Sequence, residues 1–184
     1  MHHWFNKFIK RLPIFGKWRE DLIRERLWSH KRLLFVNFIF QRLLGINMDT
    51  PWSVNYTSVV SCPEHITIER GVRRSFALSI GCYFQGYNGI FIGEETLFGP
   101  GVRVLSANHE IGDVEKKAPP IYIGRRCWLG ANVIILPGIT LGNDTIVGAG
   151  AVVTRNFPEG KVVLTGIPAK AIRSLAEGES LGQE

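Results

Sequence analysis

Aliphatic residues recur at every sixth position in the second half of the chain. They stand at Ile123, Leu129, Ile135, Leu141, Val147 and Val153. Four of the six are followed directly by glycine, at Gly124, Gly130, Gly142 and Gly148. A helix returns apolar residues every three to four positions and an amphipathic strand every two, so neither period explains the pattern. It predicts a hexapeptide-repeat solenoid in which each unit forms one short strand and one tight corner.

Three such units would close one triangular coil of about eighteen residues, and coils would stack about 4.8 Å apart. Less regular apolar segments at 66–72, 80–84, 90–98 and 102–105 predict earlier coils of the same solenoid. Residues 106–120 interrupt it with a polar stretch that has two prolines and no aliphatic spacing. An insertion of this length predicts a loop extruded from the stack, and such loops commonly carry function.

Residues 1–50 predict a basic, aromatic helical extension, interrupted at Pro13 and Gly16, with a longer helix over about 20–44. Ten Lys or Arg and four acidic residues lie here, so this segment accounts for the whole net charge of +6. Within 1–46, an apolar stripe at helical spacing comprises Trp4, Phe5, Phe8, Ile9 and Leu12. It could contact an anionic membrane surface, or pack on the solenoid or a neighbouring subunit. The apolar run 33–40 is too short to cross a bilayer, which needs about twenty residues.

The repeats, His109 at the mouth of the loop, Trp128 before Leu129-Gly130, and the closing sequence from Gly166 to Arg173 resemble the hexapeptide-repeat acyltransferases. This family includes galactoside, maltose and serine acetyltransferases. The likeness covers about residues 51–175 and implies an all-β solenoid, a left-handed parallel β-helix over 51–168. The left-handedness comes from the resemblance alone, because parallel crossovers are normally right-handed. We expect residues 169–184 to form a short helix and a tail.

The resemblance implies that His109 is the general base that accepts a proton from the attacking acceptor. Asn108 precedes it in the same motif. A base needs a partner that fixes its tautomer. Glu110 is the first candidate, with Asp113 or a backbone carbonyl as alternatives.

The resemblance also implies acetyl-CoA as co-substrate, held in a groove between two subunits of a homotrimer. Trp128 would line the cleft, although it could instead fill an inter-subunit groove. Small residues leave the backbone accessible to the cofactor, and cations offset its phosphates. The candidate donor-binding residues are Trp128, Gly130, Ala131, Gly148, Ala149, Thr154, Arg155, Lys170 and Arg173.

The acceptor side is represented by Gln85 and Asn88, in a segment about one and a half coils before His109. Their amides could bind acceptor hydroxyls, although Gly86 and Gly89 also fit a plain turn. We therefore expect an acetyl-CoA-dependent O-acetyltransferase acting on a sugar hydroxyl in a capsule, lipopolysaccharide or exopolysaccharide precursor. An N-acetyltransferase acting on an amino sugar nucleotide, and a noncatalytic trimeric scaffold, remain alternatives.

Several classes are disfavoured. Only His65 and His109 lie in the solenoid region, which is too few for a zinc site of three histidines, so we expect no metal. Cys62, Cys82 and Cys127 have no metal-binding spacing and predict reduced core residues. No nucleic-acid module accompanies the basic segment. No secretory signal is recognised, so we expect a cytoplasmic protein, with the inner face of the membrane as an alternative.

Overall fold

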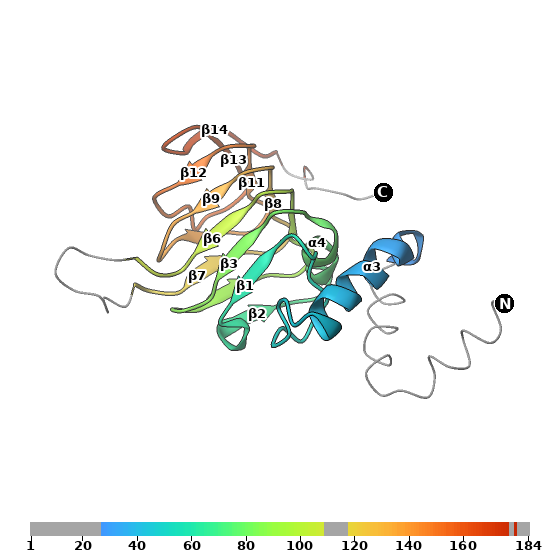
Figure 1. Cartoon of the computed structure of the whole chain (residues 1–184). Helices are drawn as coiled ribbons and strands as arrows, with labels where there is room; N and C mark the ends of the chain where they lie inside the picture. The colour runs from blue at the N-terminus through green and yellow to red at the C-terminus, as the bar shows by residue number, and fades with distance from the viewer. Residues whose placement is uncertain (1–26, 109–117, 177–178, 180–184) are drawn as a thin grey trace.

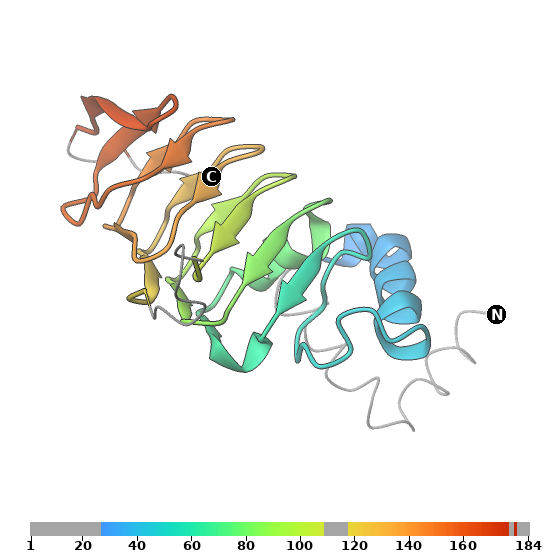
Figure 2. The ribbon, with the colours of Figure 1, turned by 60° about the vertical axis from the view of Figure 1, so that its left-hand side comes forward.

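The computed structural model describes residues 27–108, 118–176 and 179. Three sheets of short strands form the faces of a triangular prism, and successive coils stack along its axis (Figures 1 and 2). Face A contains β1 (Val59–Ser61), β3 (Tyr83–Gln85), β6 (Arg103–Leu105), β9 (Ile134–Ile135) and β12 (Val152–Val153). Face B contains β2 (Ile66–Ile68), β4 (Ile90–Ile92), β7 (Ile121–Ile123) and β10 (Thr140–Leu141). Face C contains β5 (Leu97–Phe98), β8 (Trp128–Leu129), β11 (Ile146–Val147), β13 (Val162–Thr165) and β14 (Lys170–Ser174).

The repeated aliphatic residues form columns that fill the prism. On face A, the parallel register places Val104 beside Ile135 and Ile135 beside Val153. On face C, Leu129 pairs with Val147. All of these side chains are at most 1% exposed. Full burial of such a side chain contributes about 1.5–3 kcal/mol, so the six-residue period is the period of the core.

Glycine follows the core residue because the next coil lies directly against the corner. A Cβ added at Gly124 would lie 2.6 Å from the backbone nitrogen of Asn143. A Cβ added at Gly130 would lie 2.6 Å from the backbone nitrogen of Ala149. Real Cβ atoms do not approach backbone this closely, so a side chain at either position would push the coils apart.

Helix α4 (Arg73–Leu78) takes the place of a face C strand in the first coil, and the sequence pattern did not predict it. Its Phe76 is 2% exposed and packs on Phe84 and Phe98, with ring centroids 4.5 Å and 5.0 Å away. Trp52 packs on the same ring at 5.4 Å. Aromatic packing therefore closes the N-terminal end of the core.

The longer predicted helix is confirmed over its described part. A 3-10 turn η1 (Leu27–His30), helix α3 (Lys31–Phe38) and a π-helical turn η2 (Ile39–Leu43) follow one another. Two buried amides fasten them to the solenoid, because Asn37 Nδ2 donates to the carbonyl of Ala77 at 2.9 Å and Gln41 Nε2 donates to that of Trp52 at 2.8 Å. The aromatic stripe of residues 4–12 lies outside the described residues. Among the helices that the structure describes, none is long and apolar enough to cross a membrane.

The predicted C-terminal helix from residue 169 is wrong. Residues 170–174 form strand β14, which pairs antiparallel with β13 and aligns Lys170 with Thr165. Gly166, at φ +95°, lies in the turn that brings the chain back beside β13. Because the open edge of β13 offers backbone partners there, a strand satisfies these groups without a helix. Leu175 then caps the core, at 8% exposure.

Candidate functional site

The prism has three kinds of corner. The loop corner, between faces A and B, comprises residues 86–89, 106–108, 118–120 and 136–139. The polar corner, between faces B and C, comprises residues 93–96, 124–127 and 142–145. The small-residue corner, between faces C and A, comprises residues 99–101, 130–132 and 148–150. The predicted site residues divide among these corners.

The insertion 106–120 occupies the loop corner, because it joins β6 on face A to β7 on face B. The structure describes its two ends, up to Asn108 and from Ala118. His109, Glu110 and Asp113 lie outside the described residues. The position at which the sequence pattern places the loop is thereby confirmed, and the roles of these three residues stay predictions.

Gln85 and Asn88 hold the first residues of the loop. The backbone N–H of Ala107 donates to Gln85 Oε1 at 3.2 Å, and Asn88 Nδ2 donates to the carbonyl of Ser106 at 2.8 Å. The hydroxyl of buried Ser106 accepts from the backbone N–H of Asn88 at 2.9 Å. Register pairs Gln85 with Leu105, so this segment lies one coil from the loop base, not one and a half. Gln85 Nε2 and Asn88 Oδ1 take no part in these bonds.

The small-residue corner presents backbone at its surface. Ala131 and Ala149 lie one coil apart, and the N–H of Gly150 donates to the carbonyl of Ala131 at 2.8 Å. Within the part of the chain that the structure describes, the N–H groups of Ala131 and Ala149 have no acceptor. Gly130 and Gly148 complete this column, and Ala149 is exposed. Two N–H groups without a partner among the described residues can bind the carbonyl oxygens of an extended ligand.

Trp128 lies on face C beside this corner. It is half-buried and stands between Leu97 and Ile146 in the parallel register of β5, β8 and β11. The structure therefore brings Trp128 together with the Gly130-Ala131 and Gly148-Ala149 pairs. An aromatic side chain here can pack along an apolar part of the same ligand.

The predicted basic residues are found at two places. Lys170 lies on β14 opposite Thr165. Thr165 in turn lies against Gly148, since its Cγ2 would be 2.8 Å from a Cβ added there. Lys170 is therefore near the small-residue corner. Thr154 and Arg155 follow β12 at the loop-corner side, where the Arg155 guanidinium lies 5.1 Å from the ring centroid of Phe157. All of these residues were predicted to line one groove, but a single chain by itself does not bring them together.

Arg173 already has a carboxylate partner. Its two terminal nitrogens donate to Glu179 at 2.8 Å and 3.0 Å. The hydrogen bond from Arg173 lowers the pKa of Glu179 to about 2. A phosphate that binds Arg173 would therefore have to replace a charged carboxylate at neutral pH.

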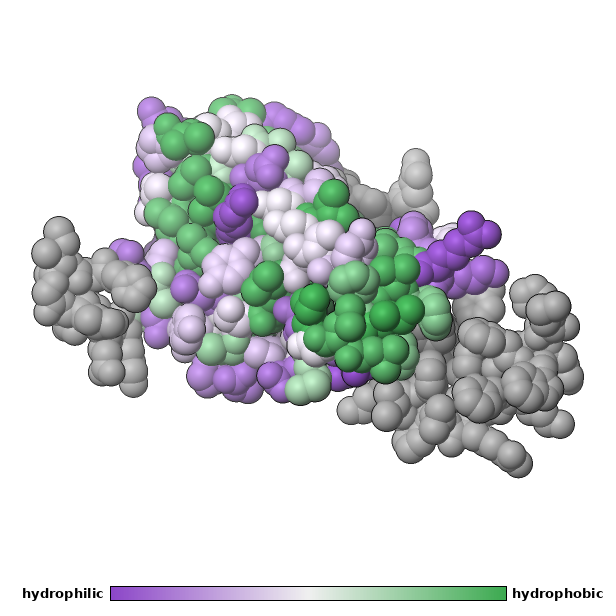
Figure 3. Space-filling view, viewed as in Figure 1, coloured by the Kyte–Doolittle hydropathy of each residue, from purple (hydrophilic) through white to green (hydrophobic). Residues whose placement is uncertain are grey.

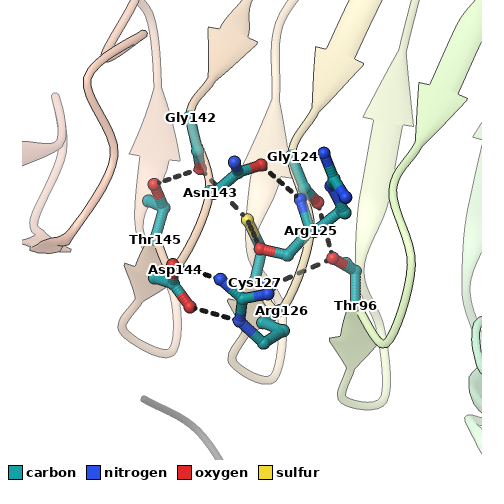
Figure 4. A network of polar contacts seen from close by, with 9 residues as sticks. All are labelled: Thr96, Gly124, Arg125, Arg126, Cys127, Gly142, Asn143, Asp144 and Thr145. Atoms are coloured by element: carbon teal, nitrogen blue, oxygen red, sulfur yellow. Dashed lines mark hydrogen bonds and ion pairs between the residues drawn. The ribbon is translucent and has the colours of Figure 1, made fainter. Parts of the chain in front are cut away.

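The polar corner is filled by side-chain hydrogen bonds that the sequence analysis did not single out (Figure 4). Arg126 donates to both carboxylate oxygens of Asp144, at 2.7 Å and 2.8 Å. Thr96 Oγ1 donates to the carbonyl of Gly124 at 2.7 Å and accepts from the N–H of Cys127 at 3.0 Å. The signal was present in the sequence, because Arg125-Arg126 and Asn143-Asp144 occupy equivalent positions in successive coils.

The three cysteines are free thiols, and two of them are buried. Cys82 and Cys127 are buried, as predicted for core residues, whereas Cys62 is half-buried. Burial raises the pKa of the Cys127 thiol to about 11. The thiolate is the reactive form, so this cysteine is unreactive at neutral pH.

Sequence and structure comparisons agree with this geometry. The model of the bacterial transferase hexapeptide (six repeats) family matches residues 120–155. A galactoside O-acetyltransferase from Lactococcus lactis is 36% identical over 63 residues, which are 32% of this chain and 30% of that protein. Nodulation protein L from Rhizobium leguminosarum is 31% identical over 107 residues, which are 54% of this chain and 56% of that protein. The chain thus spans about half of the curated relatives' length or less.

One solved structure shares nearly the whole fold. It is a galactoside acetyltransferase in complex with coenzyme A, with a TM-score of 0.57 and 23% identity, covering 91% of this chain and 94% of that one. The left-handed parallel β-helix is thereby confirmed. The repeats of residues 120–155 and the similar sequences are thus those of hexapeptide-repeat transferases, and the chain shares their fold.

Proposed function

We propose that this protein transfers the acetyl group of acetyl-CoA to a hydroxyl group of a sugar, in the assembly of a polysaccharide. The observation that carries the proposal is the small-residue corner, where the N–H groups of Ala131 and Ala149 have no acceptor among the described residues and lie beside Trp128. The pantetheine arm of coenzyme A has two amides, whose carbonyls are acceptors for such donors. Lys170, which lies near this corner, would offset the charge of its phosphates. The coenzyme A bound to the structurally similar galactoside acetyltransferase supports the same donor.

In the proposed reaction both substrates are bound together. His109 accepts the proton of the sugar hydroxyl while its oxygen attacks the thioester carbonyl. The carbon–sulfur bond then breaks, the acetyl ester remains on the sugar, and the proton passes to the departing thiolate. Main-chain N–H groups would stabilise the oxyanion. Gln85 and Asn88 act as positioning residues, because they hold the chain that leads into His109.

We further propose a homotrimer. Face A separates the loop corner from the small-residue corner of one chain, so a site that uses both corners needs a second copy. The outward positions of face A are rich in apolar side chains, including Val59 at 50% exposure and the half-buried Ile134 and Val152. Packing of this face around a threefold axis would bring the loop corner of one copy to the small-residue corner of the next. Donor groove and base would then come from different subunits.

The N-terminal end supports a location at the inner surface of a membrane as part of this proposal. Apolar surface gathers over α3 and η2 (Figure 3). Leu43, at the end of η2, is 71% exposed, and Leu44 and Met48, which follow it, are 62% and 54% exposed. Exposed cations, Lys31, Arg32 and Arg42, lie in the same segment. Apolar side chains with neighbouring cations suit an anionic lipid surface.

The test of the enzyme is the release of coenzyme A thiol from acetyl-CoA. Purified protein would be assayed with neutral sugars, amino sugars, nucleotide sugars and serine. We expect an acceptor-dependent rate that falls about a hundredfold or more in His109→Ala, because the general base is lost. His30→Ala is the matched control, since His30 lies in η1 at the N-terminal end. If coenzyme A does not bind at all, the enzyme proposal fails and a trimeric scaffold takes its place.

A further inference from the structure

A recess lies on face B, next to the base of the loop. It is an open hollow of about 530 Å³. The strands β2, β4 and β7 form its floor, and the loop ends Ala118 and Pro120 border it. Asn88 lies in its wall and also donates to the carbonyl of Ser106. A ligand in this hollow would therefore lie beside the start of the segment that carries His109.

The floor of the hollow is aromatic. The outward side chains of face B follow one another in register, with Thr67 opposite Phe91 and Phe91 opposite Tyr122. The two rings are stacked, with centroids 4.8 Å apart and planes at 7°. Phe91 remains 38% exposed and Tyr122 45%. Both rings therefore keep exposed surface that a ligand can contact, although they stack on each other.

A third ring and several polar groups surround this pair. Tyr87, at 57% exposure, lies at the loop corner of the same hollow. Glu64, His65 and Thr67 supply a carboxylate, an imidazole and a hydroxyl, and Asn88 has its Oδ1 outside the bonds to the loop. Flat apolar rings bordered by hydroxyl-binding groups match a pyranose ring, which has apolar C–H faces and a rim of hydroxyls.

The charge of the hollow separates two classes of acceptor. Among the described residues that line it there is no Lys or Arg, and Glu64 is acidic. The diphosphate of a nucleotide sugar requires cationic partners, and a carboxylate would repel it. The lining therefore favours a neutral saccharide over an amino sugar nucleotide.

We propose that the Phe91–Tyr122 hollow binds a pyranose unit of a neutral oligosaccharide, which is the acceptor chain for acetyl transfer. The binding part of this inference stands on the hollow alone. The statement that the bound chain is the acceptor rests on the proposed acetyltransferase function. Extended saccharides should bind better than single sugars, because one unit occupies the hollow while the next reaches the loop corner.

The experiment measures saccharide binding to the full chain without acetyl-CoA, by saturation-transfer difference NMR and titration calorimetry. The probes are cellotetraose, maltotetraose, β-1,4-galactotetraose, their methyl monosaccharides, and UDP-N-acetylglucosamine. We expect at least one neutral tetrasaccharide to bind, and Phe91→Ala/Tyr122→Ala to weaken it tenfold or more. Phe91→Tyr and Tyr122→Phe, which keep both rings, should bind within about twofold of the wild type.

Tyr56→Ala is the matched control. Tyr56 is also 38% exposed and also packs on another ring, that of Phe40 at 4.9 Å, but it does not line the hollow. It should leave saccharide binding unchanged. With acetyl-CoA present, the double variant should raise the KM for the saccharide and leave the KM for acetyl-CoA unchanged.

Four results would overturn the inference. They are no binding of any neutral saccharide, equal binding by the double variant, tighter binding of the nucleotide sugar than of every neutral probe, and a changed oligomeric state of the double variant in light scattering. The last would show that the rings form a subunit contact. Coenzyme A binding, measured on the same protein, separates the two proposals, because its absence beside intact saccharide binding overturns only the acetyltransferase function.

Discussion

The polar corner and the small-residue corner belong to the same coils and are built from the same six-residue unit. At the polar corner, the side chains of Thr96, Arg126 and Asp144 bond successive coils together. At the small-residue corner, the N–H groups of Ala131 and Ala149 have no acceptor among the described residues. The same face C strands connect the two corners, so the difference lies in the corner residues. Polar side chains at a corner bond the coils together, whereas small residues leave backbone groups uncovered.

The largest effect is expected from Asp144→Ala at the polar corner. The change removes two charge-assisted hydrogen bonds and places alanine at φ +57°, where aspartate is better tolerated. We expect a loss of about 3 kcal/mol in the free energy of unfolding, measured by urea denaturation. Asp144→Asn keeps the shape and the backbone preference, so it should lose less. If Asp144→Ala stayed folded but had an altered KM for acetyl-CoA, the prediction that the polar corner only stabilises the protein would be contradicted.

Ala149→Leu tests the small-residue corner. In contrast to Asp144→Ala, it should change the kinetics with acetyl-CoA and leave stability unchanged. The new side chain would cover the exposed N–H groups without entering the core, because Ala149 is at the surface. We expect the KM for acetyl-CoA to rise about tenfold, which corresponds to about 1.4 kcal/mol, with the unfolding midpoint unchanged. Ala176→Leu, at an exposed alanine near the C-terminal end, serves as the control. Unchanged donor kinetics in Ala149→Leu would remove the pantetheine from this corner.

The smallest effect is expected from Glu179→Gln. Because Arg173 lowers the pKa of Glu179 from 4.5 to about 2, the ion pair is complete above pH 4.5 and is lost as pH falls through 2. Both groups are at the surface, so unfolding at pH 7 should not change measurably. Release of Arg173 should lower the KM for acetyl-CoA about twofold, with stronger salt dependence. A raised KM would instead mean that Glu179 orients Arg173 for the phosphates.

The core and the loop position were predictable because each depends on local spacing. The aliphatic residues that recur every six positions over 123–153 form the core columns that contain Leu129 and Ile135. The interruption of this repeat at 106–120 falls between β6 and β7, at the loop corner. The two aromatic residues of the hollow could also have been recognised from the sequence pattern. Phe91 lies between Ile90 and Ile92, and Tyr122 between Ile121 and Ile123, so both sequences place one aromatic residue outward on face B.

Strand β14 and helix α4 were not predictable from the same pattern. Residues 170–174 form a strand because β13 has an open edge beside them, and that edge exists only once the last coil is folded. Helix α4 replaces a strand because Phe76 completes an aromatic cluster with residues from two later strands. Both outcomes depend on partners distant in sequence, which can outweigh local preference.

The sequence by itself determined the solenoid, its hexad core, the place of the loop and the small residues that leave backbone exposed. These follow from side-chain volume and polarity at regular intervals, which act over a few residues. Tertiary structure alone decided that Gln85 and Asn88 anchor the loop, that Phe91 stacks on Tyr122, and that the small-residue and loop corners lie on different edges of the prism. Those relations arise between coils, because only stacking brings residues tens of positions apart into contact.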